Sequence, residues 1–81
     1  MYTTYILYSD KLGKKYVGFT SDLESRLVSH NHPNNTGFTK AGMPWRLIHV
    51  ETFDTKKEAM DREKFLKTGH GRDWMKANLK Y

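Results

Sequence analysis

The feature that most constrains this chain is the absence of cysteine from only 81 residues. Disulfides, thiolate metal sites and a cysteine nucleophile are excluded, so stability must come from packing. A chain of this length is sufficient for one domain with a compact core and modest stability. Its 37% hydrophobic and 14% aromatic content is globular rather than disordered. We therefore expect residues 1–81 to form a single domain.

The charge balance favours a polyanionic partner. The formal net charge is +5, and the pI is about 9.6. Basic domains gain from the release of counterions around phosphates, although lysines also serve as a solubilising surface. No apolar run approaches the ~20 residues of a membrane span, and residues 1–4 lead into a strand-like pattern without a signal peptide. We expect a cytoplasmic protein with no membrane contact.

The first third of the chain reads as a hairpin followed by a helix. Residues 2–8 and 14–20 are rich in β-branched and aromatic residues, and a turn signal separates them. Ser21 and Glu24 form a capping-box pattern, with Ser21 at the N-cap. This pattern predicts a helix from there to about residue 31.

The rest of the chain predicts a long loop, a strand and two helices. Residues 32–44 contain two prolines and two glycines, which is typical of a loop, and loops of that length are often functional. Residues 45–53 alternate as a strand. Thr55 begins a second capping box for a helix to about residue 68, where Gly69 and Gly71 should stop it. A short last helix is expected over 72–79.

The resulting order is β-β-α-β-α-α. It predicts an α+β fold with a small three-stranded, mainly antiparallel sheet flanked by helices.

One carboxylate stands out in the predicted second helix. At 100° per residue, Leu66, Ala59 and Met60 form the apolar arc, and Glu63 points into the middle of it. Burial of an unpaired charge is costly, so a carboxylate there needs a partner or a purpose. A salt bridge to an arginine, or a partly hydrated position, accounts for Glu63 as well as a functional role does.

Other candidate functional groups lie on the first helix and the hairpin. Arg26 and His30 are four residues apart, so they share one side of the helix, where they can bind a phosphate and transfer a proton. An ordinary solvated flank is the plainer interpretation. Tyr5, Tyr8 and Tyr16 lie on the hairpin, where tyrosines are most often packing residues. The pattern does not fix the hairpin register, so it leaves open whether Tyr5 and Tyr16 share a face.

Five short motifs follow one another along nearly the whole chain. Ten residues separate the two motif tyrosines. In order, the motifs are Thr3-Thr4-Tyr5, Tyr16-Val17-Gly18, Arg26 within residues 22–27, His30, and Glu63 within residues 58–67. In this order and spacing the chain resembles the GIY-YIG nuclease superfamily, in its small stand-alone branch akin to the catalytic domain of the bacterial excision-repair nuclease.

Two features of the chain depart from the family pattern. Thr3-Thr4 replaces the Gly-Ile of the first signature, and a late asparagine that some members use has only Asn78 as a loose counterpart. Residues 71–74, Gly-Arg-Asp-Trp, do resemble this small branch.

The resemblance implies metal-assisted hydrolysis of DNA phosphodiester bonds, in repair or recombination. Glu63 would anchor one Mg²⁺ or Mn²⁺ ion, which tolerates a single protein carboxylate because it keeps several waters. Arg26 would neutralise charge on the phosphoryl oxygens. Tyr5 would help to deprotonate the attacking water, Tyr16 would orient it, and His30 would assist or take over as the base.

Substrate contacts are expected from lysines along the chain. The predicted backbone contacts are Lys14, Lys15, Lys40, Lys64 and Lys67, together with Arg46. The substrate is expected to be DNA, with branched, nicked and flapped forms all open, and the sequence leaves RNA open as well. A protein partner is one source of specificity. Two alternatives stay open: a nucleic-acid-binding module that does not cut, and a subunit of a larger repair complex.

Overall fold

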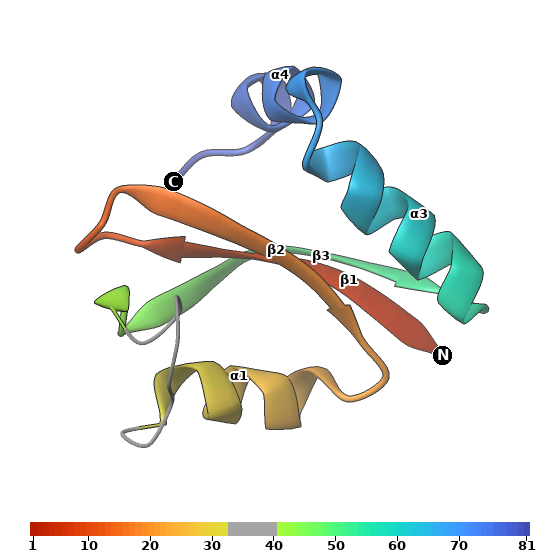
Figure 1. The fold of residues 1–81 in the computed structure, drawn as a ribbon, viewed down its shortest axis with the longest axis horizontal. Helices are drawn as coiled ribbons and strands as arrows, with labels where there is room; N and C mark the ends of the chain where they lie inside the picture. Colours follow the sequence, from red (N-terminus) through yellow and green to blue (C-terminus); the bar gives the residue numbers. More distant parts are fainter. Residues whose placement is uncertain (33–40) are drawn as a thin grey trace.

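A computed structural model describes residues 1–32 and 41–81. The expected elements occur in the expected order (Figure 1). They are β1 (Tyr2–Ser9), β2 (Lys14–Thr20), α1 (Leu23–Asn31), β3 (Trp45–Phe53), α3 (Lys56–Leu66) and α4 (Gly69–Asn78). The strands form one antiparallel sheet in the order β2-β1-β3, so the predicted α+β fold is confirmed. The loop predicted over 32–44 falls largely on residues 33–40, outside the described part of the chain.

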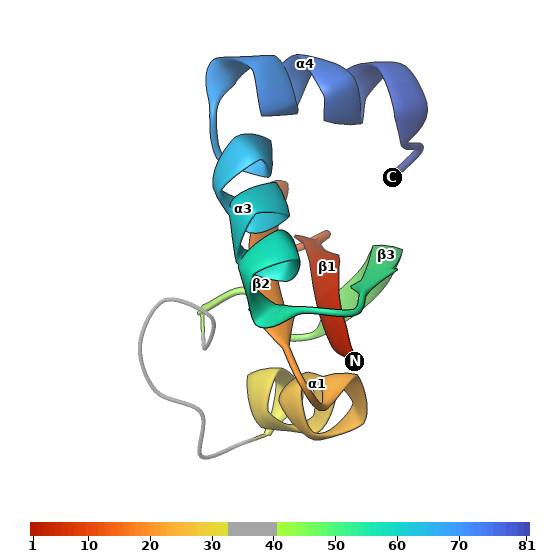
Figure 2. The same cartoon turned by 90° about the vertical axis from the view of Figure 1, so that its right-hand side faces the viewer.

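Helices cover both faces of the sheet. Figures 1 and 2 show α1 on one face and both α3 and α4 on the other. The central strand β1 supplies side chains to both layers, because successive residues of a strand point to opposite faces. Tyr5 and Leu7 pack with Trp45 beneath α1, whereas Ile6 packs toward α3 and α4. The central strand is therefore buried on both sides, and four of its residues are completely inaccessible to solvent.

The first helix begins one residue later than predicted, because Asp22 and not Ser21 is the N-cap. Asp22 Oδ1 accepts from the backbone N–H of Ser25 at 3.2 Å, and Oδ2 accepts from the Ser25 hydroxyl at 2.9 Å. Both residue types cap helices well. The path of the chain decides between them, since Thr20 Oγ1 accepts from the Asp22 N–H at 3.0 Å and fixes the exit from β2. The predicted cap at Thr55 is confirmed.

The boundary between the last two helices was also predicted wrongly. Helix α3 ends at Leu66, and α4 begins at Gly69 rather than at Arg72. Thr68 caps α4 by accepting from the Gly71 N–H at 3.1 Å. Gly71 lies inside α4 because of close packing: a Cβ there would meet the Phe65 carbonyl oxygen at 2.1 Å. The two glycines that read as a helix stop instead allow α4 to start against the end of α3.

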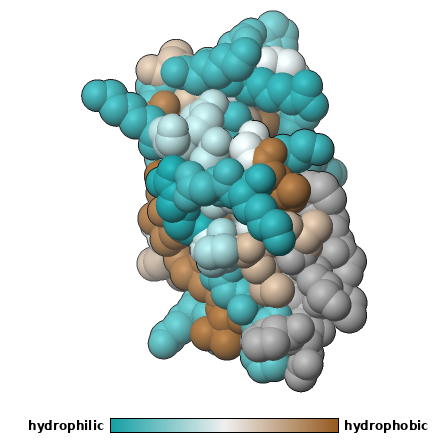
Figure 3. Space-filling view, turned by 90° about the vertical axis from the view of Figure 1, so that its left-hand side faces the viewer, coloured by the Kyte–Doolittle hydropathy of each residue, from teal (hydrophilic) through white to brown (hydrophobic). Residues whose placement is uncertain are grey.

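The molecular surface is mixed in character. Hydrophilic side chains gather over the upper part of the face in Figure 3, the end at which Figure 1 places α4. Among the described residues, no helix has the length and apolar content needed to cross a membrane.

Candidate active site at the edge of strand β2

The strand register brings the two motif tyrosines to one face of the sheet. Tyr5 on β1 lies opposite Gly18 on β2, and Tyr16 lies opposite Leu7. Tyr5 and Tyr16 therefore both point toward α1, with ring centroids 6.4 Å apart. Gly18 is required beside Tyr5, because a Cβ at this position would lie 2.6 Å from the Tyr5 hydroxyl. The glycine of the second motif thus leaves room for the tyrosine of the first.

Helix α1 brings Arg26 and His30 to the same tyrosines. Tyr5 Oη and His30 Nε2 are hydrogen-bonded at 3.0 Å, and the His30 and Tyr16 ring centroids are 4.8 Å apart. His30 is 6% exposed, so it is not on a solvated flank. Asn31 fastens the end of α1 to β3, since it accepts from the Trp45 N–H at 2.6 Å and donates to the Trp45 carbonyl at 3.1 Å.

Glu63 approaches the tyrosines from α3. Its side chain is 17% exposed, and its ion pair is with Lys67, one turn later on the same helix, at 3.5 Å. Lys67 is itself 54% exposed. The buried salt bridge to an arginine that the sequence allowed is therefore not the arrangement found. Glu63 is a mostly buried carboxylate, and its charged partner is a half-exposed lysine on the same helix.

These side chains surround one hollow of about 380 Å³, which we call the edge hollow. It lies beside the edge strand β2. Its lining comprises Tyr5, Tyr16, Gly18, Phe19, Thr20, Arg26 and Glu63. A guanidinium, a carboxylate and two phenols are thus brought together from four different elements. His30 contacts this group through the Tyr5 hydroxyl.

The donors at the edge hollow fit one kind of metal ion. Within the described ranges, no group of three or more His, Cys, Asp or Glu side chains is placed to hold a metal. A closed structural zinc or calcium site is therefore not built there. One carboxylate with open space beside it fits Mg²⁺ or Mn²⁺, which retain water and take substrate oxygens as further ligands.

Burial sets the protonation of the Tyr5–His30 pair. Burial raises the pKa of Tyr5 above 10.0, and the neighbouring Arg26 guanidinium only partly opposes this. Burial, followed by repulsion from Arg26, lowers the pKa of His30 below 6.5. Both groups are consequently neutral at pH 7, with Tyr5 protonated and His30 able to accept a proton.

Comparison with known proteins identifies the family. A family model for the GIY-YIG catalytic domain matches residues 1–78. The chain belongs to the GIY-YIG catalytic domain family. Membership assigns it to a family of nucleases and confirms the resemblance drawn from the motifs.

The relatives of this GIY-YIG domain include small proteins named only as UPF0213. The chain is 41% identical over 58 residues to one from Staphylococcus saprophyticus, across 72% of this chain and 71% of that protein. It is 46% identical over 48 residues to one from Bacillus velezensis, across 59% of this chain but about half (48%) of that protein.

A solved structure gives the same fold. The solution NMR structure of the UPF0213 protein from Bacillus halodurans matches with a TM-score of 0.57 and 28% identity. The match covers 95% of this chain and 84% of that chain.

The predicted nucleic-acid contacts of this GIY-YIG domain separate into groups. Lys14, Lys15 and Lys67 line a second hollow between β2 and α4. Lys64 is exposed on α3 and is not in the described lining of either hollow. Arg46 is paired with Asp10 at 2.9 Å, at the start of β3. Lys40 lies outside the described residues.

Four residues that matter to these sites were not among the predicted site residues. Gly18 and Asn31 shape the edge hollow and hold α1, while Arg72 and Lys76 line the second hollow. A glycine inside a strand pattern is a signal for close approach of another group, so Gly18 was open to prediction. The other three depend on contacts between elements distant in sequence, for which the chain carries no local signal.

Proposed function

We propose that this GIY-YIG domain is an endonuclease that hydrolyses DNA phosphodiester bonds with one Mg²⁺ or Mn²⁺ ion. The observation that supports this is the edge hollow, where Glu63, Arg26, Tyr5 and Tyr16 converge beside an open strand edge. Its size suits a phosphate group together with a hydrated cation. The net charge of +5 favours the approach of a polyanion.

Glu63 would hold the metal ion. Its carboxylate lines the hollow, and its charged partner is the half-exposed Lys67, which can be displaced by a metal ion. When bound, such an ion supplies charge stabilisation for the phosphoryl oxygens and the leaving oxygen. Lys67 then loses its partner and is free to bind a neighbouring phosphate.

Arg26 would bind and neutralise the scissile phosphate. Its guanidinium lies at the hollow among the phenols, and a planar fork of donors matches two phosphoryl oxygens. Charge that develops on those oxygens during attack is stabilised most where the donors are already oriented.

Tyr5 and His30 would move the proton of the attacking water together. Because burial raises the pKa of Tyr5, its phenol is not a standing base at neutral pH. The 3.0 Å contact allows Tyr5 O–H to pass its proton to His30 Nε2 while Tyr5 Oη takes one from water. Tyr16, at the mouth of the same hollow, would orient the water.

The setting of this activity is part of the same proposal. We place it in DNA repair or recombination in the cytoplasm, on branched, nicked or flapped DNA, with a protein partner that supplies specificity. A non-catalytic nucleic-acid-binding module, or a subunit of a larger repair complex, is the alternative. A binder would gain nothing from a mostly buried glutamate beside an arginine and two phenols, which favours the enzyme.

The deciding experiment compares Glu63→Gln with the wild type. Supercoiled plasmid and nicked, flapped and branched oligonucleotides are incubated with Mg²⁺, with Mn²⁺ and with chelator. We expect metal-dependent cleavage that falls at least about 100-fold in Glu63→Gln. Glu24→Gln, an exposed carboxylate on α1, is the matched control and should cut normally. Salt-sensitive binding without cutting by the wild type would establish the binding module instead.

A second pair of variants assigns the proton transfer. Tyr5→Phe removes the hydroxyl, and His30→Gln removes the acceptor while retaining bulk. If the pair acts as a unit, the cleavage rate should fall by a similar factor in both single variants and in the double variant, because the two losses are not additive. Full cleavage by Tyr5→Phe would move the base role to His30 alone.

A further inference from the structure

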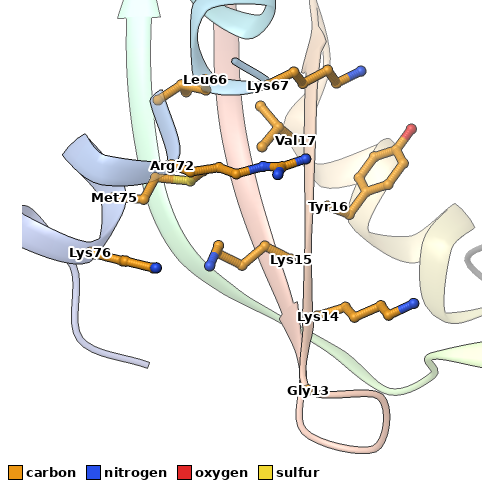
Figure 4. A pocket seen from close by; sticks show the side chains of 10 residues that line it. All are labelled: Gly13, Lys14, Lys15, Tyr16, Val17, Leu66, Lys67, Arg72, Met75 and Lys76. Carbon is orange, nitrogen blue, oxygen red and sulfur yellow. The ribbon is translucent and has the colours of Figure 1, made fainter. Parts of the chain in front are cut away.

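A second hollow, on the opposite face of the sheet from α1, has a wall of positive charge. It has a volume of about 610 Å³ and lies between β2 and α4 (Figure 4). Its lining includes Lys14 and a group of four further cations, which are Lys15, Lys67, Arg72 and Lys76. Figure 4 shows Lys15 and Lys76 extending into it from β2 and α4, while Lys14 turns to the α1 side. We call this hollow the basic cleft.

Among these four cations, Lys67 alone has an acidic partner in the described part of the chain, Glu63 at 3.5 Å. Neither Arg72 nor Lys76 forms an ion pair with any described residue. Lys15 donates to the Tyr81 hydroxyl at 2.8 Å and lies 4.3 Å from the centre of its ring, a neutral partner that leaves the charge in place. No acidic residue is among the described lining. Four neighbouring cations repel one another, so this arrangement is suited to an anionic ligand.

The floor of the basic cleft is apolar. Val17, Leu66 and Met75 line it, and each is at most 7% exposed. A phosphate alone has no use for such a floor, whereas a nucleotide combines an anion with a flat, largely apolar base. The bases of a duplex are stacked and paired inside it, so only an unpaired base can enter a hollow of this kind. The volume is within the range of about 300–1,000 Å³ that is usual for small-ligand sites.

The basic cleft adjoins the edge hollow. Tyr16 lines both, and Lys67 of the cleft pairs with Glu63 of the edge hollow. Strand β2 is an edge strand, so a ligand can pass along it from one hollow to the other.

We propose that the basic cleft binds an unpaired nucleotide of the strand that continues from the scissile phosphate, which makes DNA with a single-stranded flap or tail the preferred substrate. This rests on the proposed endonuclease function, and it names the substrate class of the same site. The backbone phosphate contacts Arg72 and Lys76, and the base lies over the apolar floor of the cleft.

The test is a binding titration in the presence of chelator, with no cleavage. Fluorescence anisotropy is measured with a labelled single-stranded oligonucleotide and with a blunt duplex of equal length. The double variant Arg72→Gln/Lys76→Gln is compared with Lys11→Gln/Lys56→Gln, two exposed lysines that line neither hollow. Each double variant lowers the net charge from +5 to +3 by removing two positive charges.

We expect the cleft variant to lose at least about tenfold in affinity for the single strand, and the control less than about threefold. Its slope of log affinity against log salt should fall by about 1.4, or ~0.7 for each lost contact. Equal losses for single strand and duplex, or equal losses in the two double variants, would overturn the proposal.

Cleavage separates this proposal from the proposed function. A wild-type protein that cuts flapped DNA better than blunt duplex, with the preference lost in the cleft variant, supports both. If the wild type cuts but the cleft variant keeps the preference for a flap, the endonuclease stands and the cleft proposal fails. If the wild type cuts nothing, the endonuclease fails, while the anisotropy comparison still decides what the cleft binds.

Discussion

The two edges of the sheet carry the same kinds of side chain in opposite states. At the β3 edge, Glu51 uses both oxygens: Arg62 Nε donates at 2.7 Å and its terminal nitrogen at 3.1 Å, and His49 Nε2 lies 2.8 Å away. The Arg62 guanidinium also lies 4.6 Å from the centre of the Trp74 ring. In this group, the β3 network, every charge is satisfied within the protein.

At the β2 edge, an arginine, a histidine and a glutamate come together without neutralising one another. Glu63 pairs with Lys67 at 3.5 Å, whereas Arg26 and His30 both interact with Tyr5. The carboxylate, the guanidinium and two phenols line the same hollow. Residue type alone therefore does not mark a site. The glutamate, arginine and histidine of the β3 edge bind one another and contribute to stability, whereas those of the β2 edge gather around a hollow and are available to a ligand.

The largest expected effect comes from exchanging each arginine for lysine. Arg26→Lys should lower kcat about 100-fold, because a point charge does not match two phosphoryl oxygens, and should change the free energy of unfolding by less than ~0.5 kcal/mol. Arg62→Lys should lower the free energy of unfolding by about 1–2 kcal/mol and leave kcat unchanged. Cleavage kinetics and urea unfolding on both variants measure this. The distinction between the edges breaks down if each variant affects both quantities.

A smaller effect is expected from filling the space beside Tyr5. In Gly18→Ala the new methyl group meets the buried Tyr5 hydroxyl at 2.6 Å. The free energy of unfolding should therefore fall by about 1–3 kcal/mol, and the cleavage rate should fall as well. Gly69→Ala is the control, since nothing lies within 4 Å of a Cβ at this position at the start of α4. This substitution should raise the free energy of unfolding by about 0.4–1 kcal/mol. Thermal melts and cleavage rates test both. A fully active, stable Gly18→Ala would show that the two motifs are not sterically coupled.

The smallest effect is a separation of the two edges on the pH scale. The pKa of His30 is lowered in the folded protein, so the unfolded chain takes up this proton first, and stability is lost as pH falls from 6.5 through the folded pKa. For Glu51, burial opposes ionisation, but hydrogen bonds from Arg62 and His49 outweigh it and lower the pKa below 4.5. The contribution of Glu51 to the free energy of unfolding is complete above pH 4.5, and it is lost as the pH falls through the lowered pKa.

Urea unfolding between pH 3 and 8 measures both windows. His30→Gln should remove only the loss of stability that begins near pH 6.5. In the wild type, cleavage should decline over the same pH range, because a protonated His30 accepts no proton. Glu51→Gln should remove only the loss below pH 4.5. An acid decline that is identical in the wild type and His30→Gln would mean that His30 is not the titrating group.

The sequence predicted most of the candidate site before any geometry was known. Glu63 stood out because helical periodicity placed it in an apolar arc, and it is indeed mostly buried. Arg26 and His30 were linked by their spacing of four residues, which the helix α1 realises. These predictions depend on local periodicity, which is a property of the chain itself.

Local signals failed where two residues compete for one role. Ser21 and Asp22 both suit an N-cap, and the hydrogen bond that the Asp22 N–H donates to Thr20 Oγ1 decides between them. Gly69 and Gly71 read as a helix stop, but close packing of α4 on α3 gives Gly71 a different purpose.

By itself, the sequence determined the order of the elements, the α+β class, the family and the residues from which the candidate site is built, because these follow from periodicity, capping and motif spacing. The tertiary structure alone decided the register that pairs Tyr5 with Gly18, and the placement of α4 relative to β2 that creates the basic cleft. It also decided which glutamate is paired with an arginine and which faces a hollow. The reason is physical: charge neutralisation and steric fit depend on distances between residues far apart in the chain, and no local pattern encodes those distances.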